Sequence, residues 1–381
     1  MDVEEQVSLV KGIAQEIVTE EELRALFEQD AHPIAYDGFE PSGLAHLPVG
    51  VYRPLLLRQL LKAGVRFKIL LADSYAWINE KMAGDMESVR LVGDYFVEVW
   101  KASGLPIGTG PGKLQPVSHY DEMLGNREYW FRVLQVARNH SELRTKRALT
   151  IAGRKEEEIK QMAQMFYPSM QAADIFQLAD NPEKEPIIAQ LGMDQRKANM
   201  LARDTAERIG FKKPVAVHHR MLLGLDGIQS ASSSDEGKKG HEGKHESDLE
   251  IEFKMSKSRP RSSIFIHDSQ KDISEKISKA YCPQKVVEGN PVLEYAREIV
   301  FRANPSKGFT IERPKKFGGE LHFETYFQLE AAFSKGELHP MDLKNGVAAE
   351  LDGLIAPLRA HFEKGRAKEL YEKVRKLQVT R

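Results

Sequence analysis

Short apolar segments alternate with longer helical ones over the first part of the chain, and this alternation limits the possible folds most. Five segments have the composition of strands: residues 34–39, 66–73, 113–117, 187–191 and 214–218. The second of them is almost continuously apolar, as expected of a parallel strand that is covered on both faces. The alternation predicts an α/β fold, a Rossmann-type parallel sheet with helices on both sides.

The alternation is interrupted twice and then ends. Residues from about 119 to 165 have helical patterns only, which predicts a helical insertion, and residues from about 229 to 250 are mostly polar, which favours a flexible insertion. Beyond residue 268 the patterns are helical to the end. We therefore expect three parts: an N-terminal helical segment at 1–30, the Rossmann-type domain at 31–267 and an α-helical domain at 268–381.

Composition excludes several classes of protein. The 381 residues are 41% hydrophobic and 29% charged, which is typical of a globular protein with more than one core. The 55 Lys and Arg residues nearly balance the 56 Asp and Glu residues, so the net charge neither favours nor opposes nucleic-acid binding. The single cysteine, Cys282, forms no intrachain disulfide and favours a reducing compartment. No segment resembles a signal peptide or a membrane span, so we expect a cytoplasmic protein that does not bind a membrane.

One polar loop brings unusual chemistry together. The segment Lys254-Met255-Ser256-Lys257-Ser258, called the lysine loop below, holds two lysines and two hydroxyls within five residues. Mobile ammonium groups beside hydroxyl donors suit the charge that develops on a polyphosphate. A loop of this composition is, however, more often a solvated turn, so its interpretation depends on partner motifs elsewhere in the chain.

Polar residues gather where the predicted strands end. Tyr167, Gln171 and Asp174 are spaced to share one face of a helix, a pattern that on its own more often faces water. The carboxyl ends of parallel strands are where open α/β sheets bind ligands. Several such clusters at one sheet edge favour a ligand site. The full set is Tyr36, Gly38, Asp73, Tyr167, Gln171, Asp174, Gly192, Asp194 and Gln195.

Eight segments, taken in order, resemble a known family. They are residues 38–43, 71–73, 167–174, 192–197, 254–258, 282–283, 287–291 and 338–344. Together they resemble the class I aminoacyl-tRNA synthetases, and specifically the tyrosyl-tRNA synthetases of archaeal and eukaryotic type. The resemblance runs from about residue 34 to 358. It implies activation of L-tyrosine with ATP and Mg²⁺, transfer of tyrosine to tRNA(Tyr), and a helical C-terminal domain that binds the anticodon.

The resemblance also implies which residues hold tyrosine. Tyr36 and Asp174 would bind the phenol hydroxyl, which agrees with its need for one donor and one acceptor. The ammonium group would be held by three residues, with Asp73 as a helper: Tyr167, Gln171 and Gln195. Read without the family, Tyr36 is equally consistent with an aromatic residue packed in a strand.

The ATP site implied by the resemblance joins two motifs. His46 matches the first histidine of a His-Ile-Gly-His signature, whereas Pro48 and Val49 replace its glycine and second histidine. This departure places more weight on Lys254 and Lys257, which would act with His46 in catalysis. The remaining ATP contacts would come from Gly38, Gly192, Asp194, Met255, Ser256 and Ser258. No residue is assigned to a protein-bound metal.

For tRNA, the resemblance implies contacts in two places. Phe317, His339 and Asp342 would read the first anticodon base, and Asp342 is alternatively a helix N-cap after Pro340. Arg147 and Arg196 would meet acceptor-stem phosphates, although solvated basic surface is an equally good interpretation of each. A homodimer formed through the helical insertion is also expected.

Two rival interpretations remain open at this stage. A tryptophanyl-tRNA synthetase would have the same architecture, and a catalytically inactive, synthetase-like RNA-binding protein would keep the folds without the chemistry. Tyr36 with Asp174 argues against the first, and the intact polar clusters with both loop lysines argue against the second.

Overall fold

The computed structural model describes residues 1–152, 161–228 and 246–377, except the side chains of 246–248 and of Phe317. It contains two compact units. Unit 1 consists of Met1–Gly43, Leu56–Arg220 and Leu370–Arg381, and unit 2 consists of Leu44–Leu55 and Met221–Glu369. These units are defined by how compactly their residues pack, and their bounds differ from those of the predicted domains at 1–30, 31–267 and 268–381. The division into functional domains therefore stays a prediction.

Unit 1 is built around a six-stranded sheet with the strand order β1-β6-β5-β2-β3-β4. The strands are β1 (Glu16–Val18), β2 (Ile34–Phe39), β3 (Arg66–Leu71), β4 (Leu114–Ser118), β5 (Ile188–Gly192) and β6 (Val215–His219). All neighbours pair in parallel except β1, which pairs antiparallel with β6. The predicted Rossmann-type parallel sheet is confirmed. The edge strand β1 was not predicted, because its three residues lie within a helical pattern.

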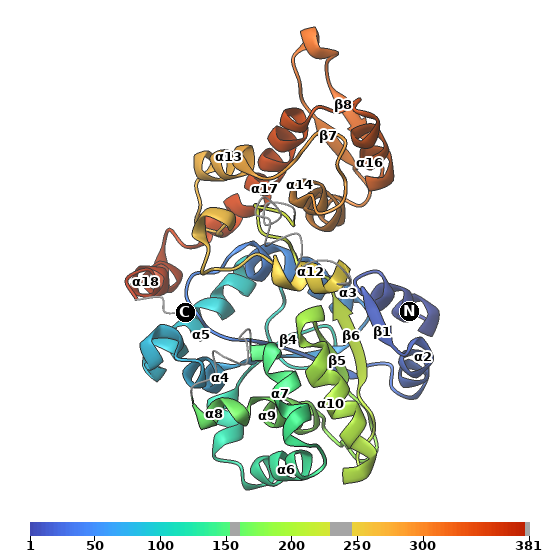
Figure 1. The fold of residues 1–381 in the computed structure, drawn as a ribbon, viewed down its shortest axis with the longest axis vertical. Coiled ribbons are helices and arrows are strands. Elements are labelled where there is room, and N and C mark those ends of the chain that lie inside the picture. The colour runs from blue at the N-terminus through green and yellow to red at the C-terminus, as the bar shows by residue number, and fades with distance from the viewer. Residues whose placement is uncertain (153–160, 229–245, 378–381) are drawn as a thin grey trace. The chain divides into compact units, whose positions relative to one another are not determined.

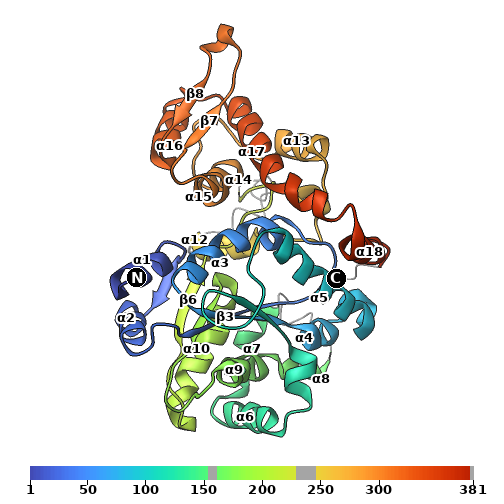
Figure 2. The same cartoon turned by 180° about the vertical axis from the view of Figure 1, so that it is seen from behind.

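Helices cover both faces of this sheet. Figure 1 and Figure 2 show α3 and α5 on one side and α9 and α10 on the other. The helices of unit 1, with α3 starting in the last residues of a unit 2 segment, are α1 (Val3–Lys11), α2 (Glu20–Gln29), α3 (Arg53–Lys62), α4 (Asp73–Ile78), α5 (Met86–Ala102), α6 (Arg127–Arg138), α7 (Glu142–Ala148), α8 (Met162–Met165), α9 (Tyr167–Leu178) and α10 (Arg196–Ala206). The expected helical insertion is therefore present in its described residues.

The sheet reverses its winding between β2 and β5. These two strands pair only at Ala35 with Ile188 and at Tyr36 with Ala189. Beyond Tyr36 no further pair joins them, so their carboxyl ends separate. A reversal of strand order with diverging strand ends is the place where open α/β sheets bind ligands.

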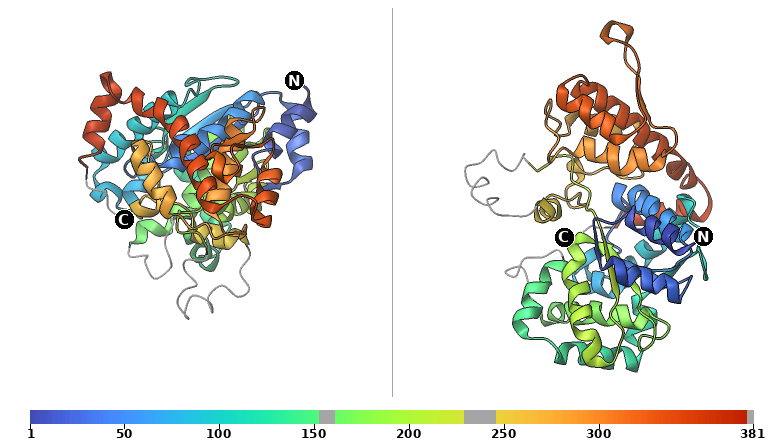
Figure 3. Two further views of the ribbon diagram at one scale, coloured as in Figure 1. Left: turned by 90° about the horizontal axis from the view of Figure 1, so that it is seen from above. Right: turned by 90° about the vertical axis from the view of Figure 1, so that its right-hand side faces the viewer.

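Unit 2 is mainly helical, as predicted. Its helices are α12 (Glu246–Glu252), α13 (Gln270–Lys279), α14 (Pro291–Tyr295), α15 (Phe301–Ala303), α16 (Tyr326–Lys335), α17 (Pro340–His361) and the first half of α18 (Gly365–Val374). A two-stranded antiparallel hairpin, β7 (Phe309–Ile311) with β8 (Leu321–Phe323), was not predicted. Phe309 and Ile311 are buried while Thr310 is exposed, so three residues suffice to place one strand face on the helices. Figure 3 shows the hairpin loop, in orange, extending beyond those helices.

Two further expectations concern the flexible insertion and membrane spans. The flexible insertion at 229–250 lies outside the described residues up to 245, but its last five residues form the beginning of α12. Glu250 is buried there, so this end of the insertion is part of the folded unit. Among the described residues, no helix combines the length and the apolar character needed to cross a lipid bilayer.

Candidate active site

Tyr36 in β2 presents an unsatisfied buried hydroxyl. The side chain is 1% exposed, and its hydroxyl has no hydrogen-bond partner among the described residues. Burial raises the pKa of Tyr36 well above its usual value, the negative charges of Asp174 and Asp37 raise it further, and the nearby side-chain amide of Gln171 lowers it in part. The phenol is therefore a neutral donor that lies near Asp174. Because buried hydroxyls are nearly always paired, this hydroxyl is available for a ligand.

Asp174 on α9 is held by neighbouring donors. Its Oδ2 accepts a hydrogen bond from the Tyr75 hydroxyl at 2.5 Å, and its Oδ1 lies 3.1 Å from Nε2 of His119. The same nitrogen lies 3.0 Å from the hydroxyl of Tyr129. A carboxylate only accepts hydrogen bonds, so these groups fix its orientation. A substrate hydroxyl would have to donate to the remaining lone pairs.

Sequence reasoning missed Tyr75, His119 and Tyr129. His119 directly follows β4, so the rule that strand ends carry site residues would have found it. Tyr75 lies two residues after Asp73, on the first turn of α4, and its ring packs against Tyr167 at 4.5 Å between centroids. Tyr129 on α6 carries no comparable signal, because a buried aromatic on an amphipathic helix is ordinarily a core residue.

The polar face of α9 forms as predicted. The amide of Gln171 donates to Oε1 of Gln195 at 3.0 Å, and the amide of Gln195 donates to the carbonyl of Ile151 at 3.0 Å. Oε1 of Gln171 is buried and has no partner among the described residues. The Tyr167 hydroxyl donates to Oε1 of Glu40 at 2.8 Å. Gln171 therefore presents a free acceptor, and Tyr167 is oriented by a carboxylate.

Asp73 is bonded mainly to the scaffold. Its Oδ1 accepts from the backbone N–H of Ser74 at 2.8 Å and of Tyr120 at 2.7 Å. Its Oδ2 accepts from the Ser118 hydroxyl at 2.6 Å. These bonds fasten the loop after β4, which carries His119. The contacts thus describe Asp73 as a loop anchor, and its role as a helper for the ammonium group stays a prediction.

Gly38, Gly192 and Asp194 lie at the carboxyl ends of β2 and β5. A Cβ built on Gly38 meets nothing closer than Leu70, at 3.9 Å. Nothing in the described protein therefore requires glycine at position 38, whereas a close ligand would. Gly192 ends β5, and Asp194 follows it in the short 3₁₀ turn Met193–Gln195.

In unit 2, the segment around His46 pairs with the segment that follows the lysine loop. His46 and Phe265 face each other in an antiparallel bridge. Burial lowers the pKa of His46 well below its usual value, and the charges of Lys257 and Lys254 lower it further. The imidazole is therefore neutral near pH 7 and close to both lysines. Its Nδ1 has no hydrogen-bond partner within the described residues.

The lysine loop is shaped by local bonds. The N–H of Met255 donates to the carbonyl of Leu222 at 2.7 Å, and Met255 itself is buried. The hydroxyls of Ser256 and Ser258 lie 2.9 Å apart. The lysine loop and His46 therefore lie in the same unit, as expected if the two motifs act together.

Two of the three predicted anticodon residues, His339 and Asp342, lie at the start of α17. His339 is its N-cap, since its Nδ1 accepts from the N–H of Met341 at 3.1 Å. The alternative of Asp342 as the N-cap is therefore wrong. Asp342 lies in the first turn, with Oδ2 3.9 Å from a guanidinium nitrogen of Arg313. Phe317 ends a short 3₁₀ turn in the hairpin loop, and its side chain lies outside the described part.

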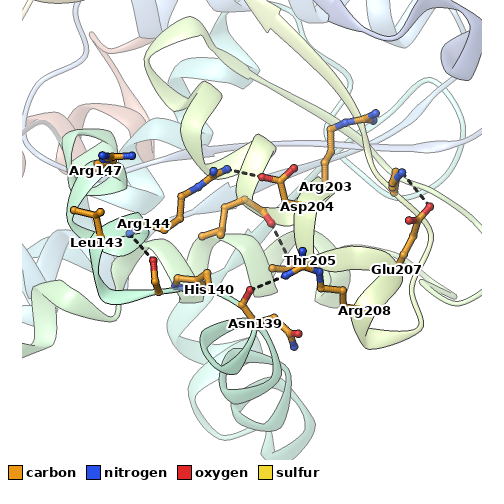
Figure 4. A pocket seen from close by; sticks show the side chains of 13 residues that line it. Asn139, His140, Leu143, Arg144, Arg147, Arg203, Asp204, Thr205, Glu207 and Arg208 are labelled. Atoms are coloured by element: carbon orange, nitrogen blue, oxygen red, sulfur yellow. Dashed lines mark hydrogen bonds and ion pairs between the residues drawn. The ribbon is translucent and has the colours of Figure 1, made fainter.

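Arg147 and Arg196 have different surroundings. Arg196 is bound to the carboxylate of Glu16 at 2.8 to 3.0 Å. Arg147 is exposed and lines a polar cavity of about 700 Å³ between α7 and α10 (Figure 4). In that cavity Arg144 is paired with Asp204 at 2.5 Å. No ion pair of Arg147 is found within the described residues, so its guanidinium is the more available of the two.

In the described ranges, no group of three or more His, Cys, Asp and Glu side chains is arranged to hold a metal ion.

Comparison with known proteins gives concordant matches. A family model described as "tRNA synthetases class I (W and Y)" matches residues 28–240 and 247–356. The tyrosine–tRNA ligase of Saccharolobus solfataricus is 40% identical over 384 residues, covering 100% of this chain and 99% of the relative. That of Thermococcus kodakarensis is 40% identical over 394 residues, covering both chains completely.

Solved structures are similar over nearly the whole chain. The tyrosyl-tRNA synthetase of Pyrococcus horikoshii, solved with L-tyrosine, has a TM-score of 0.83 and 37% identity, covering 98% of this chain and 100% of that one. The tyrosyl-tRNA synthetase of Aeropyrum pernix has a TM-score of 0.80 and 37% identity, covering 98% and 99%.

Proposed function

Because the chain belongs to the tyrosine–tRNA ligase family of the class I tRNA synthetases, we propose that it activates L-tyrosine with ATP and transfers it to the 3′ end of tRNA(Tyr). The predicted family is confirmed, and membership makes the chain an aminoacyl-tRNA ligase. The observation that carries the assignment of its site is the buried, unpaired hydroxyl of Tyr36 beside Asp174.

Tyr36 and Asp174 are proposed to bind the phenol hydroxyl of tyrosine. The Tyr36 hydroxyl donates to the phenol oxygen, and the phenol donates to the carboxylate of Asp174. Phenylalanine would leave both buried groups unpaired, at a cost of about 1–3 kcal/mol or more for each group. The discrimination known for this enzyme class is about 10⁵, a general value and not one derived from this chain.

Gln171, Gln195 and Tyr167 are proposed to bind the ammonium group. The free Oε1 of Gln171 is the acceptor that such a group needs. Gln195 orients Gln171 through their hydrogen bond. Asp73 supports the site from the loop after β4 and contributes negative charge.

Activation needs no protein nucleophile. A carboxylate oxygen of tyrosine attacks the α-phosphorus of ATP, the bond from that phosphorus to the bridging oxygen breaks, and pyrophosphate leaves with the bond's electron pair. His46, Lys254 and Lys257 are proposed to stabilise the charge that develops on the phosphates. The Mg²⁺ required is proposed to arrive with ATP, as part of the substrate. Gly38, Gly192, Asp194, Met255, Ser256 and Ser258 are proposed to position the nucleotide.

In the second step, the ribose hydroxyl at the 3′ end of tRNA attacks the tyrosyl carbonyl, and AMP leaves. Phe317, His339 and Asp342 are proposed to bind the first anticodon base, with Asp342 accepting from a guanine. Arg147 is proposed to meet an acceptor-stem phosphate, because its guanidinium lines an open polar cavity. Arg196 would have to exchange its bond with Glu16 for a phosphate, which preserves its charge pairing.

A homodimer through the helical insertion is also proposed. Trp130, Phe131 and Leu134 on α6 are 38%, 61% and 64% exposed. Large apolar side chains gathered on one exposed helix indicate a protein interface. The helical insertion supplies this helix, as expected from the sequence.

We also propose that the protein is located in the cytoplasm.

Tyrosine-dependent exchange of pyrophosphate into ATP tests the proposed function. Exchange with tyrosine, and none with tryptophan, is the expected result. Exchange with tryptophan alone would favour the tryptophan-specific rival. Binding of tRNA without any exchange would favour the inactive, RNA-binding rival.

A further inference from the structure

Residues 263–268, called the connecting segment below, join both phosphate-handling motifs of unit 2. The N–H of Leu47 donates to the carbonyl of Ile264 at 2.7 Å, and the N–H of Ile266 donates to the carbonyl of Ala45 at 3.1 Å. These two bonds flank His46 on both sides. A shift of the connecting segment therefore shifts His46.

The same segment holds the lysine loop. The Ser263 hydroxyl donates to the carbonyl of Ser256, in the middle of that loop, at 2.7 Å. Ser263 is fully buried, as are Ile264 and Ile266. Because buried hydrogen bonds are costly to leave unpaired, this bond fixes the loop against the segment. His46 and the two lysines thus share one support.

At its other end the connecting segment is fastened to α13 and α17. Oδ2 of Asp268 accepts from the N–H of Phe265 at 2.8 Å and from Nζ of Lys276 on α13 at 2.6 Å. The carbonyl of Asp268 accepts from the guanidinium of Arg359 on α17 at 2.6 Å. The same guanidinium is paired with Asp352, about two helical turns earlier on α17, at 2.5 Å. Charge-assisted bonds of this kind are short and directional.

Helix α17 runs from His339 and Asp342 to Arg359, and Pro357 near its end donates no backbone hydrogen bond to the carbonyl of residue 353. It spans 22 residues, a length of about 33 Å at 1.5 Å per residue. Leu343, Val347, Leu351 and Ile355 are fully buried along it. It lies beside α13 in both views (Figure 1, Figure 2). Ile355 and Leu358 are buried on either side of Pro357, so a displacement of the first turns is passed to the last turn through the packing of these side chains.

We propose that Arg359 is a positioning residue that couples anticodon binding at the start of α17 to the phosphate groups of the reaction. The route runs from α17 through Arg359 and Asp268 to the connecting segment, and from there to His46 and the lysine loop. The inference rests on the proposed function, because it requires that α17 reads the anticodon and that these motifs act on ATP. Arg359 touches no substrate in this account.

The test measures how much a change of the first anticodon base alters kcat and KM of aminoacylation, with and without Arg359. Aminoacylation by the full-length wild type, Arg359→Gln and Arg359→Lys is assayed with tRNA(Tyr) and with tRNA whose first anticodon base is changed. In the wild type, the base change should raise KM and lower kcat, the latter by about tenfold. In Arg359→Gln the KM penalty should remain while the kcat penalty falls to about twofold or less. Arg359→Lys, which keeps one charged donor, should lie between them.

Controls separate this coupling from misfolding and from a wrong function. Arg366→Gln removes an exposed arginine on α18, seven residues further along the chain, and should keep the wild-type penalties. If Arg359→Gln fails to fold, Asp352→Asn frees the same guanidinium and should reduce the kcat penalty equally. An unchanged kcat penalty in the folded variants, or no kcat penalty in the wild type, overturns the coupling. Loss of tyrosine-dependent pyrophosphate exchange in the wild type instead overturns the proposed function.

Discussion

The carboxylate of Asp174 accepts from Tyr75 and lies within hydrogen-bond distance of His119, and it is proposed to bind the phenol of the substrate as well. Asp174→Asn keeps the size of the side chain but replaces one acceptor oxygen with a donor. We expect kcat/KM for tyrosine in pyrophosphate exchange to fall by about 10²-fold or more, since the phenol loses its acceptor. Asp180→Asn, an exposed aspartate just after α9, is the matched control. Near-normal kinetics in Asp174→Asn would remove the carboxylate from the phenol site.

Gly38 distinguishes a glycine required by a ligand from one required by the fold. A Cβ at this position meets only Leu70, at an ordinary distance of 3.9 Å. Gly38→Ala should therefore leave Tm within a few degrees while raising KM for ATP by about tenfold. Thermal unfolding and the KM for ATP are the two measurements. A large drop in Tm with unchanged KM would give Gly38 a purely structural role.

Lys257 is expected to act on the transition state. Lys257→Ala should lower kcat of tyrosine activation by about 10²-fold with little change in KM for tyrosine, because the charge it stabilises develops only as pyrophosphate leaves. Lys271→Ala, a strongly exposed lysine on α13, controls for loss of a positive charge. An effect confined to KM would contradict the proposed role.

For single residues, the sequence indicated those that lie at the end of a predicted strand or within a recognised motif. Tyr36, Gln171 and Asp174 were singled out because their positions follow the sheet and one helix face, and the structure places them in β2 and on α9 while their roles stay predictions. Tyr75 and Tyr129 were not, since their hydroxyls meet Asp174 only after α4 and α6 pack against α9. Asp73 was found, but the three scaffold donors around it depend on the fold of the loop after β4.

Among the elements, α6 carries an unusual outer face. Phe131 and Leu134 are more than half exposed on it. Phe131→Asp together with Leu134→Asp should convert the proposed dimer into a monomer, because two charges would then have to be buried at the interface. Sedimentation velocity measures the change. A wild type that already sediments as a monomer would show that this face does not form the dimer.

Element prediction failed where tertiary contacts decide. Strand β1 has only three residues, and its place at the sheet edge is fixed by Glu16, which binds Arg196 and His218 from other elements. The β7–β8 hairpin is equally short, and its strands are defined by pairing with each other. Patterns of three residues cannot be separated from loops by periodicity, whereas the longer helices and the buried strands β5 and β6 could be.

On the scale of the whole molecule, acid should destabilise the fold through buried histidines. Burial, helped by the charge of Arg359, lowers the pKa of His267 to about 4. The unfolded chain then takes up a proton below its ordinary pKa that the folded chain does not. Stability should fall as pH drops from about 6.5 to about 4, by up to about 3 kcal/mol from this group.

The variant His267→Gln checks this contribution. Free energies of unfolding from denaturant titrations, compared between pH 7 and pH 4, should differ less in the variant than in the wild type. An equal difference in both proteins would show that His267 does not titrate with the lowered pKa.

Two features support the proposed function. In unit 1, the ends of β2 and β5 diverge and buried polar groups are unpaired. In unit 2, a neutral His46 lies close to two lysines. The first is proposed to select the amino acid and the second to handle the phosphates. The alternation of strands and helices predicted the first unit's architecture, but not which buried polar atoms would be left unpaired.

The preference for tyrosine over phenylalanine in pyrophosphate exchange, measured for the wild type and for Tyr36→Phe, shows whether the Tyr36 hydroxyl binds the phenol of the substrate. If the Tyr36 hydroxyl binds the phenol, the wild type should strongly prefer tyrosine, and Tyr36→Phe should lose about 10²-fold or more of that preference, chiefly through a lower kcat/KM for tyrosine. An unchanged ratio of the two kcat/KM values in Tyr36→Phe would contradict the account.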